Sequence, residues 1–525
     1  MQRWLFLILI LIVAFLGILI VVEQYQAYWQ CPLSVRKVLG GMETNRDELY
    51  EAVTAYQRTG NEQRLRALYF LLENMDQHSF ALAGLKDSTG TKINYDISEF
   101  ANLAEAEAKL DSLQEEFGEL NFRLLKRCTD NQEMTAVLLS ENIEEAFKAW
   151  KEFPWSRNYS EHDFLNYILP YRGSNEPLTS FRPRFEVRYA QAIKELESST
   201  DIMAVAAAIN EQLKAEFRFN AKYYLHPTDQ SLAEMLESGE GRCEDMTNYA
   251  IYALRANGIA VTSDYTPYWA DSDNNHAWNA IILPSGEALP FMGCESNPGV
   301  YTLRQRIAKV YRKMYARQQE SLGMQLLDSE GAPAWLAGKN YLDVTRAYVP
   351  TVEVSLTTLY EVADSVRFVY LAVYNDGDWR AIAWGKLESG ASELHDVGVD
   401  LVYLPVYYLK EKLEPAGEVF LLNESGRQEE LTGNGTLQDM TLRSTTRMRQ
   451  ANLSEESDQI SLQDGYNYEL QYWESGWQSA GTQECTGKPL HFTEVPAGKL
   501  YRLLAQDEDN KGRIFIYREN GQIWY

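Results

Sequence analysis

The chain has 525 residues, which is too long for a single hydrophobic core and predicts three to four folded units. Hydrophobic residues make up 45% of it and charged residues 24%, as in folded rather than disordered proteins. The formal net charge of −26 argues against the basic face that nucleic acid needs, so we expect no nucleic-acid partner. Without a glycine-rich phosphate loop or paired metal-ligand spacing, the sequence predicts no cofactor and no metal.

An uncharged apolar segment, residues 4–22, opens the chain. As a helix it is long enough to cross a hydrocarbon core of about 30 Å. Arg3 precedes it and Glu23 follows it, and the positive end of such a segment stays in the cytoplasm. We therefore expect residues 1–23 to anchor a single-pass membrane protein whose remainder is extracytoplasmic, periplasmic or on the cell surface. The open alternative is a cleaved signal segment and a secreted protein.

Apolar residues at helical spacing predict a helical region over residues 24–175. Asn45-x-x-Glu48 resembles a capping box ahead of its first helix. Further helices are expected after Asn61, over 97–126 and over 133–153.

The chain contains five cysteines: Cys31, Cys128, Cys243, Cys294 and Cys485. In an oxidising compartment an odd number leaves one thiol over, which is then available for catalysis. Cys31 and Cys128 lie in the same predicted helical region and are candidates for a disulfide.

The most informative stretch is 239–258, GEGRCEDMTNYAIYALRANG, which predicts a helix that begins at Cys243. The unpaired N–H groups and the positive dipole end at a helix start stabilise a thiolate. After a polar loop, His276 begins a run that predicts a strand. Thiol acyl transfer requires such a nucleophile together with a base that takes and later returns its proton.

These motifs resemble the transglutaminase-like superfamily, which has a papain-like fold with Cys, His and Asp on a helix and two successive strands. The matching segments are Gly241-x-Cys243, Leu254-Arg255-x-x-Gly258-Ile259 and His276-Ala277-Trp278-Asn279. The resemblance implies a domain over 176–345 with Cys243 as nucleophile and His276 as base. It implies a peptidase, an amidase or an acyltransferase.

The third residue departs from the family pattern, because Met292 stands where the family keeps its Asp. A methionine cannot orient an imidazole, so either another acceptor serves or the Cys–His pair works unaided. Glu295 is the first choice as the catalytic acceptor, with Asn279 and Asp264 as further candidates. The residues predicted to bind substrate are Trp269, Trp278, Asp264 and Asn279.

Other short sequence segments resemble those of bacterial extracytoplasmic members of this superfamily, which carry a helical N-terminal region and β-rich C-terminal modules. They are Phe70–Met75, Pro170-Tyr171-Arg172, Asn175-Glu176-Pro177, Phe291-Met292-Gly293, Asp343-Val344-Thr345 and Tyr403–Tyr408. This resemblance implies an architecture and a location, and no particular substrate.

After Thr345 the spacing of apolar residues changes from helical to alternating. This predicts a β-sandwich over 346–447 and a small β domain over 448–525. Asn375-Asp376-Gly377-Asp378 and Asn520-Gly521 are hairpin signals. Aromatic residues on these strands are candidates for glycan contacts, although aromatic residues also suit strands on packing grounds alone.

The sequence therefore predicts a multidomain α+β protein with an N-terminal transmembrane helix, a helical region, a transglutaminase-like core and C-terminal β-sandwich-like domains. The predicted function is thiol-dependent amide or peptide hydrolysis or acyl transfer on a peptide, protein or cell-wall substrate. The alternative is a catalytically silent envelope protein that binds peptide or glycan.

Overall fold

The computed structural model describes residues 15, 27–42, 44–196, 200–357, 359–446, 461–506, 512–519 and 521–525. The chain divides into two compact units. Unit 1 comprises Met1–Asp264, Ala277–Thr302 and Lys313–Arg317, and unit 2 comprises Tyr265–His276, Leu303–Arg312 and Gln318–Tyr525. The five-part division expected from the sequence stays a prediction.

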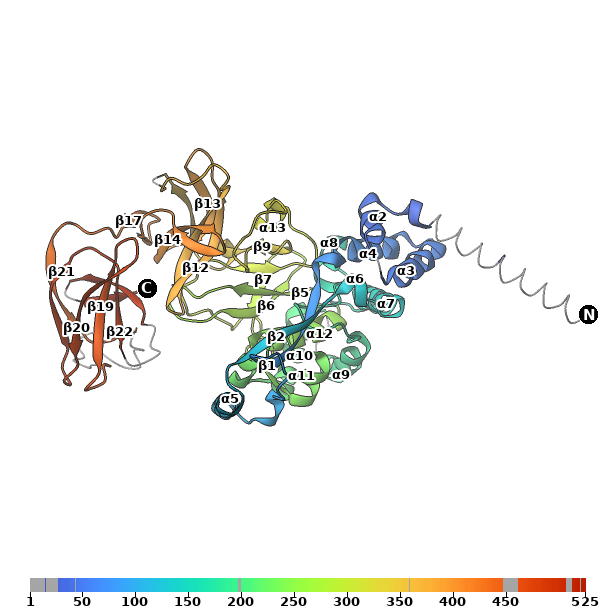
Figure 1. Cartoon of the computed structure of the whole chain (residues 1–525). Helices are drawn as coiled ribbons and strands as arrows, with labels where there is room; N and C mark the ends of the chain where they lie inside the picture. Colours follow the sequence, from blue (N-terminus) through green and yellow to red (C-terminus); the bar gives the residue numbers. More distant parts are fainter. Residues whose placement is uncertain are drawn as a thin grey trace, which may run out of the picture. The chain divides into compact units, whose positions relative to one another are not determined.

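Helices dominate the regular structure of unit 1 (Figure 1). The described α-helices are α2 (Leu33–Gly40), α3 (Arg46–Thr59), α4 (Glu62–Asn74), α5 (Leu103–Phe117), α6 (Asp130–Glu133), α7 (Ala136–Glu152), α8 (Glu161–Asp163), α9 (Arg182–Lys194), α10 (Ile202–Glu216), α11 (Leu232–Ser238) and α12 (Cys243–Ala256). Short helical turns are η1 (Met75–Gln77), η2 (Ile97–Glu99), η3 (Phe164–Ile168) and η4 (Ala221–Leu225).

The helices predicted after Asn45, after Asn61 and over 133–153 are confirmed as α3, α4 and α7. Asn61 caps α4 as expected, because its side chain accepts a hydrogen bond from the N–H of Arg64 at 3.1 Å. The capping box at Asn45 is wrong. Asn45 instead donates to the carbonyl of Met134 at 2.7 Å, and Glu48 accepts from the N–H of Ala136 at 2.8 Å. Both side chains hold the start of α7 rather than their own helix.

The helix predicted over 97–126 is only partly correct, because its second half is a strand. Helix α5 ends at Phe117 and is followed by Gly118, whose φ of 80° suits a glycine. Strand β2 (Leu120–Thr129) then pairs antiparallel with β1 (Ser79–Asp87), also inside the predicted helical region. Leu113 of α5 packs with Leu85 of β1. Pairing between segments some forty residues apart overrides the local helical spacing.

All five cysteines are free and buried, so the predicted Cys31–Cys128 disulfide is not formed. The thiol of Cys31 donates to the carbonyl of Ala27 at 3.2 Å, and Cys128 faces Phe80 in the antiparallel pair β1–β2. The two side chains thus belong to different local structures.

Within the described part of the chain, no helix has both the length and the apolar character needed to span a membrane. The predicted span over residues 4–22 lies outside the described residues, apart from residue 15.

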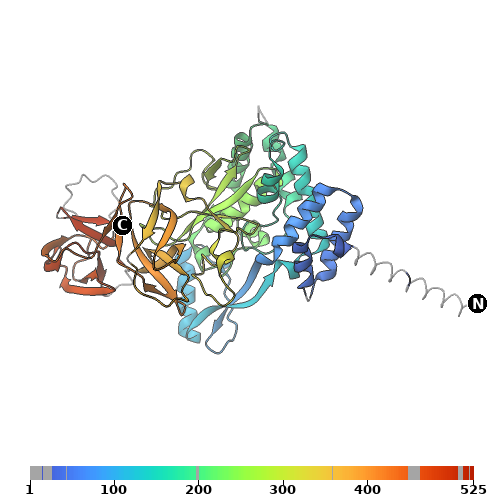
Figure 2. The same cartoon turned by 90° about the horizontal axis from the view of Figure 1, so that it is seen from above.

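Strand β6 (His276–Ile282) lies between β5 (Val261–Thr266) and β7 (Ala288–Phe291) in one sheet. On the other side of β5, Thr262 donates a hydrogen bond to the carbonyl of Lys313 in β8 (Tyr311–Lys313). The short strands β3 (Arg218–Phe219) and β4 (Glu240–Gly241) pair in parallel just before α12. Helix α12 packs against α7, α9, α10 and α11, and these helices can be followed in Figures 1 and 2.

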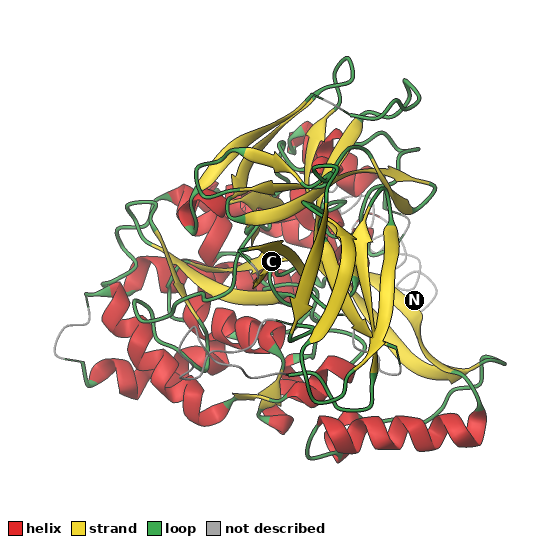
Figure 3. Ribbon diagram, turned by 90° about the vertical axis from the view of Figure 1, so that its left-hand side faces the viewer, coloured by secondary structure: helices red, strands yellow, loops and turns green. Residues whose placement is uncertain are grey.

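Strands make up almost all the regular structure of unit 2, as the yellow arrows of Figure 3 help to follow. They are β9 (Tyr341–Asp343), β10 (Thr351–Leu356), β11 (Phe368–Asn375), β12 (Asp378–Lys386), β13 (Ser392–Gly398), β14 (Leu401–Leu409), β15 (Lys412–Pro415), β16 (Phe420–Leu422), β17 (Gln428–Glu430), β18 (Leu437–Leu442), β19 (Asn467–Trp473), β20 (Trp477–Glu484), β21 (Leu490–Pro496), β22 (Tyr501–Ala505), β23 (Ile514–Arg518) and β24 (Gly521–Trp524). Helix α13 (Leu322–Gln325) and the turn η5 (Thr345–Ala347) precede most of them.

The strands after residue 350 form two pairs of sheets. The first pair is β10-β13 and β12-β11-β14-β16-β17, in which β15 also pairs with β14. Val354 of β10 and Val369 of β11 share one buried core. The second pair is β18-β21 and β20-β19-β22-β23-β24, whose core includes Leu442 and Leu470. The predicted hairpins are confirmed by the pairs Asn375↔Asp378 and Arg518↔Gly521.

Several aromatic rings of these strands pack on one another. The centroids of Trp379 and Trp473 lie 5.5 Å apart, and those of Trp473 and Trp477 lie 5.2 Å apart. Trp379 and Trp473 are buried. Trp379 and Trp473 therefore pack in the interior and offer a sugar little surface, while glycan contact through the other aromatic residues stays a prediction.

Candidate active site

Cys243 is the first residue of α12, as the sequence predicts. The chain turns into the helix through Gly241, where an added Cβ would lie only 2.6 Å from the Cβ of Asp245. Asp245 organises this turn: its carboxylate accepts from the N–H of Arg242 at 3.0 Å and from the N–H of Gln230 at 3.1 Å. The Gly-x-Cys motif is thus a steric requirement, because only glycine lets the turn close and present Cys243 at the helix start.

The other end of α12 is held by Arg255. Its guanidinium donates to backbone carbonyls, at 3.0 Å to Tyr167, 3.1 Å to Pro170 and 2.6 Å to Arg172. It also donates to the carbonyl of Val261, at the start of β5. The segment Pro170-Tyr171-Arg172 therefore lies against α12, and Arg255 fixes both to β5.

Gly258 completes this helix end. Its φ is 72°, and an added Cβ would lie 2.5 Å from the carbonyl oxygen of Ala149. No other residue would fit there without moving α7. The motif Leu254-Arg255-x-x-Gly258 is thus explained by packing and by backbone conformation.

The thiol of Cys243 is enclosed, with 4% of the residue exposed. It donates a hydrogen bond to the carboxylate of its neighbour Glu244 at 3.1 Å. The N–H of Ala277, in β6, bonds to the same sulfur. Because Ala277 directly follows His276, this contact brings the start of β6 to the start of α12.

These surroundings raise the pKa of Cys243 well above its ordinary value, first through burial and then through the negative charge of Glu244. The N–H of Ala277 and the charge of Arg242 act in the opposite direction and are outweighed. This is opposite to the thiolate expected from a helix start alone. A cysteine held as a neutral thiol needs a base to take its proton during attack.

His276 begins β6 as predicted. Its ring is stacked on Trp269, with centroids 5.7 Å apart and planes inclined by 28°. Trp269 is itself 6% exposed, so it supports the imidazole while offering a substrate little surface. A separation of roughly 3–5 Å between the Cys243 sulfur and an imidazole nitrogen stays a prediction.

At the third position, Met292 is buried and Glu295 is exposed. The carboxylate of Glu295 acts on two groups near α12, because its charge contributes to raising the pKa of Tyr301 and of Cys294. Its proposed role as acceptor for His276 stays a prediction.

Asn279 links three elements of the site, and its two predicted roles stay predictions. It is fully buried, accepts from the N–H of Gly293 at 3.1 Å and donates to the carbonyl of Thr247 at 3.0 Å. It thereby joins β6, α12 and the loop after β7. Gly293 passes so close to the helix that an added Cβ would lie 2.4 Å from that of Ala250.

Asp264 and Trp278 are also fully buried, in β5 and β6. Neither has surface through which to contact a substrate in this conformation. Substrate binding by Trp269, Trp278, Asp264 and Asn279 therefore stays a prediction that requires the site to open. Among the described residues, no group of His, Cys, Asp and Glu side chains is arranged to hold a metal ion.

Tyr301 is a site residue that the sequence did not reveal. Burial, then the charge of Glu295 and then Cys243 raise its pKa, so its hydroxyl stays protonated near the thiol. Glu244 was missed as well. No motif marks either one, because a tyrosine in a loop and a glutamate in the first turn of a helix are both common.

We predict that Glu244→Gln makes Cys243 more reactive. Removing the carboxylate removes a charge that holds the thiol protonated, so its pKa should fall. The rate of alkylation by iodoacetamide at pH 8 should rise several-fold, measured by mass spectrometry of the Cys243 peptide. Glu107→Gln, an exposed change in α5, is the control. Equal rates in the two variants would show that Glu244 does not govern the thiol.

A comparison with protein families matches the part of the chain that contains this site. Residues 188–291 match the family model of the transglutaminase-like superfamily. This match includes Cys243, His276 and the strands on either side of β6. No curated protein matches the chain.

Two solved structures are similar at low identity. A candidate cysteine protease from Cytophaga hutchinsonii is 17% identical, with a TM-score of 0.18, over 23% of this chain and 41% of that protein. Red sea bream transglutaminase is 9% identical, with a TM-score of 0.20, over 85% of this chain and 76% of that protein. This chain thus spans less than half the length of the first.

With TM-scores this low, neither structure adds to the assignment, which rests on the family match and on the placement of Cys243 and His276 at the starts of α12 and β6. Residues 188–291 of this chain are a transglutaminase-like domain.

Proposed function

We propose that this chain is a membrane-anchored extracytoplasmic enzyme that hydrolyses an amide or peptide bond, or transfers the acyl group, through a Cys243 thioester. The contact between the Cys243 sulfur and the N–H of Ala277 carries the proposal. It brings the residue next to His276 to the thiol, at a helix start where N–H groups without helical partners can receive an oxyanion.

The first half of the reaction begins with a neutral thiol. As the Cys243 sulfur attacks the carbonyl carbon of the substrate, its proton passes to His276 and the carbonyl oxygen becomes an oxyanion. Collapse of the adduct breaks the bond to the leaving amine, which takes the proton from His276. The product of this half is a thioester on Cys243. Water or a second amine, deprotonated by His276, then releases the acyl group and restores the thiol.

A pocket in unit 1 supports a peptide substrate. It has a volume of about 450 Å³ and lies between residues 81–98, on and after β1, and residues 223–238. Asp229 lines it and forms an ion pair with Arg242 at 2.7 Å. Since Arg242 directly precedes Cys243, this ion pair links the wall of the pocket to the start of α12.

Trapping the intermediate tests the enzymatic part of the proposal. An activated ester such as p-nitrophenyl acetate should acylate Cys243, and mass spectrometry of the quenched protein should locate the added acetyl group on that residue. Cys243→Ala should show no adduct at this position, and Cys485→Ala, a buried cysteine in unit 2, should acylate like the wild type. Acylation spread over other side chains, with none on Cys243, would refute it.

The anchor is a separate part of the proposal and rests on residues 4–22 alone. The full chain should stay with membranes after a carbonate wash, and protease should reach the remainder only from the outer side. A soluble protein whose mature N-terminus lies near residue 28 would show a cleaved signal instead.

One alternative has observations in its favour. Met292 replaces the family Asp, and the thiol of Cys243 is enclosed with a raised pKa. Both suit a catalytically silent domain that binds peptide or glycan. The two functions differ in the trapping experiment, because a silent domain would form no thioester.

A further inference from the structure

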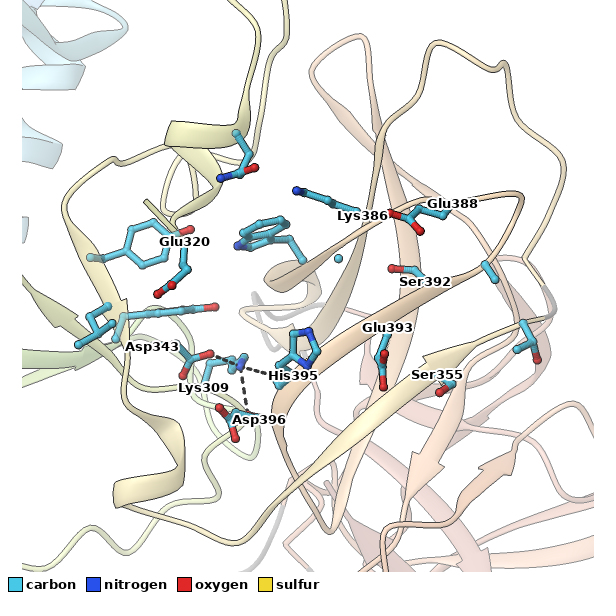
Figure 4. A pocket seen from close by; sticks show the side chains of 18 residues that line it. Lys309, Glu320, Asp343, Ser355, Lys386, Glu388, Ser392, Glu393, His395 and Asp396 are labelled. Atoms are coloured by element: carbon cyan, nitrogen blue, oxygen red, sulfur yellow. Dashed lines mark hydrogen bonds and ion pairs between the residues drawn. The ribbon is translucent and has the colours of Figure 1, made fainter. Parts of the chain in front are cut away.

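A second pocket lies wholly within unit 2, far along the chain from the nucleophile. Its volume is about 830 Å³, and its walls come from β9, β10, β12, β13 and the segment around Lys309 (Figure 4). None of the residues that line it lies within 188–291, the segment that matches the family model.

Fixed aromatic rings form one wall. Trp384 is partly exposed, packs edge-on against Phe368 with centroids 5.7 Å apart, and hydrogen-bonds the hydroxyl of Tyr341. Tyr311 is buried, and its hydroxyl donates to the carbonyl of Ile382 at 2.7 Å. These contacts hold the rings in place, so the wall is preformed rather than assembled on binding.

The charges that line the pocket fall into two groups. The first is internally neutralised: Lys309 pairs with Asp343 and donates to the carbonyl of His395 at 2.7 Å, and Asp396 pairs with Arg346 at 2.9 Å. The dashed lines of Figure 4 mark the bonds of Lys309.

The second group is acidic on balance. Among the described residues, Glu320, Glu388 and Glu393 line the pocket with no ion-pair partner, against one such cation, Lys386. The site therefore favours neutral or positively charged ligands and repels carboxylates.

Ser392 points independently to a ligand. The residue is 8% exposed, and its hydroxyl oxygen is buried with no hydrogen-bond partner among the described residues. Figure 4 shows this hydroxyl turned toward the inside of the pocket. At Gly385, opposite it, an added Cβ would lie 2.3 Å from that oxygen, so only glycine leaves the hydroxyl its place. Buried polar groups normally have partners, and a bound molecule would supply the missing one.

We propose that this pocket binds a saccharide that is neutral or carries amines, and not one that carries carboxylates. The apolar face of a sugar ring stacks on Trp384, a sugar hydroxyl bonds to Ser392, and Glu388 and Glu393 accept hydrogen bonds from hydroxyl or ammonium groups. The uncharged side chains of Gln325, Ser355 and Thr357 also line the pocket. Such a ring of short polar groups around one aromatic face suits a sugar better than the aliphatic stem of a basic side chain.

The test is calorimetric titration of the full chain in detergent with four probes: N-acetylated chitotriose, the deacetylated glucosamine trimer, trigalacturonate and trilysine. We expect binding of the first two and none of trigalacturonate. Cys243→Ala should bind like the wild type, which separates this proposal from the enzymatic one.

Ser392→Ala gives the sharpest variant. It should weaken saccharide binding roughly three- to tenfold, the effect of one lost hydrogen bond, while the thermal midpoint stays the same or rises because a buried unpaired hydroxyl is removed. Trp384→Ala should abolish binding, with folding checked by circular dichroism. Glu393→Gln should weaken the glucosamine trimer more than chitotriose. Glu424→Gln, an exposed change outside the pocket, is the matched control.

Three results with the saccharides would overturn the proposal. They are binding of neither saccharide at 10 mM or so, equal binding of trigalacturonate and chitotriose, and affinities that Ser392→Ala and Trp384→Ala leave unchanged. Binding of trilysine without either saccharide would overturn it as well and would identify a site for basic peptides.

Discussion

Replacing His276 by alanine is expected to slow acylation of Cys243 at pH 7 by about 100- to 10,000-fold, the usual contribution of a positioned base. The reason is the protonation of the thiol: burial and Glu244 raise the pKa of Cys243, so little thiolate exists without a base. The measurement is the rate of p-nitrophenol release in the first turnover. His162→Ala, an exposed histidine in α8, is the control and should leave the rate unchanged.

A comparison with Glu244→Gln decides which group is the base. Glu244 already accepts the thiol hydrogen at 3.1 Å, so it is the rival to His276. If His276→Ala keeps the wild-type rate while Glu244→Gln loses it, the carboxylate takes the proton and the assignment of His276 is wrong. If both variants keep the rate, Cys243 reacts without either group.

Arg255→Met is expected to lower the free energy of unfolding by about 3–5 kcal/mol, since breaking a buried charged network costs this much. Burial lowers the pKa of Arg255 to about 10, so the guanidinium is still charged at neutral pH. Its loss would remove the guanidinium donor from the buried carbonyls of Tyr167 and Arg172, and one of two donors from the carbonyl of Pro170.

Urea unfolding followed by circular dichroism measures this effect. Arg184→Met, an exposed change on α9, is the matched control and should shift the unfolding free energy by less than about 0.5 kcal/mol. A loss of less than about 1 kcal/mol for Arg255→Met would show that the hydrogen bonds of the Arg255 guanidinium add little to stability.

The nucleophile helix could be predicted from the sequence because its determinants are local. Gly241 and Gly258 stand where backbone approach or a positive φ allows no side chain, and both flank the apolar spacing of α12. The same holds for β6, whose apolar run begins directly after His276. Steric requirements of this kind can be recognised in the sequence, because they require glycine at fixed positions.

The features that the sequence did not predict depend on residues distant along the chain. Strand β2 has a helix-like spacing, and only its pairing with β1 makes it extended. Asn45 and Glu48 resemble a capping box but bond to the start of α7. Likewise, the raised pKa of Cys243 follows from burial and from the direction of the Glu244 side chain, and neither is visible in a motif.

The pH dependence of Cys243 acylation tests the central claim most directly. Acylation by p-nitrophenyl acetate would be followed from pH 5 to pH 10 in the wild type, in His276→Ala and in Cys243→Ala. If His276 is the base, the wild-type rate rises in a step as its imidazole loses a proton, His276→Ala loses that step, and Cys243→Ala forms no adduct. A rate that stays negligible below about pH 9 and is the same in the wild type and in His276→Ala would contradict the claim.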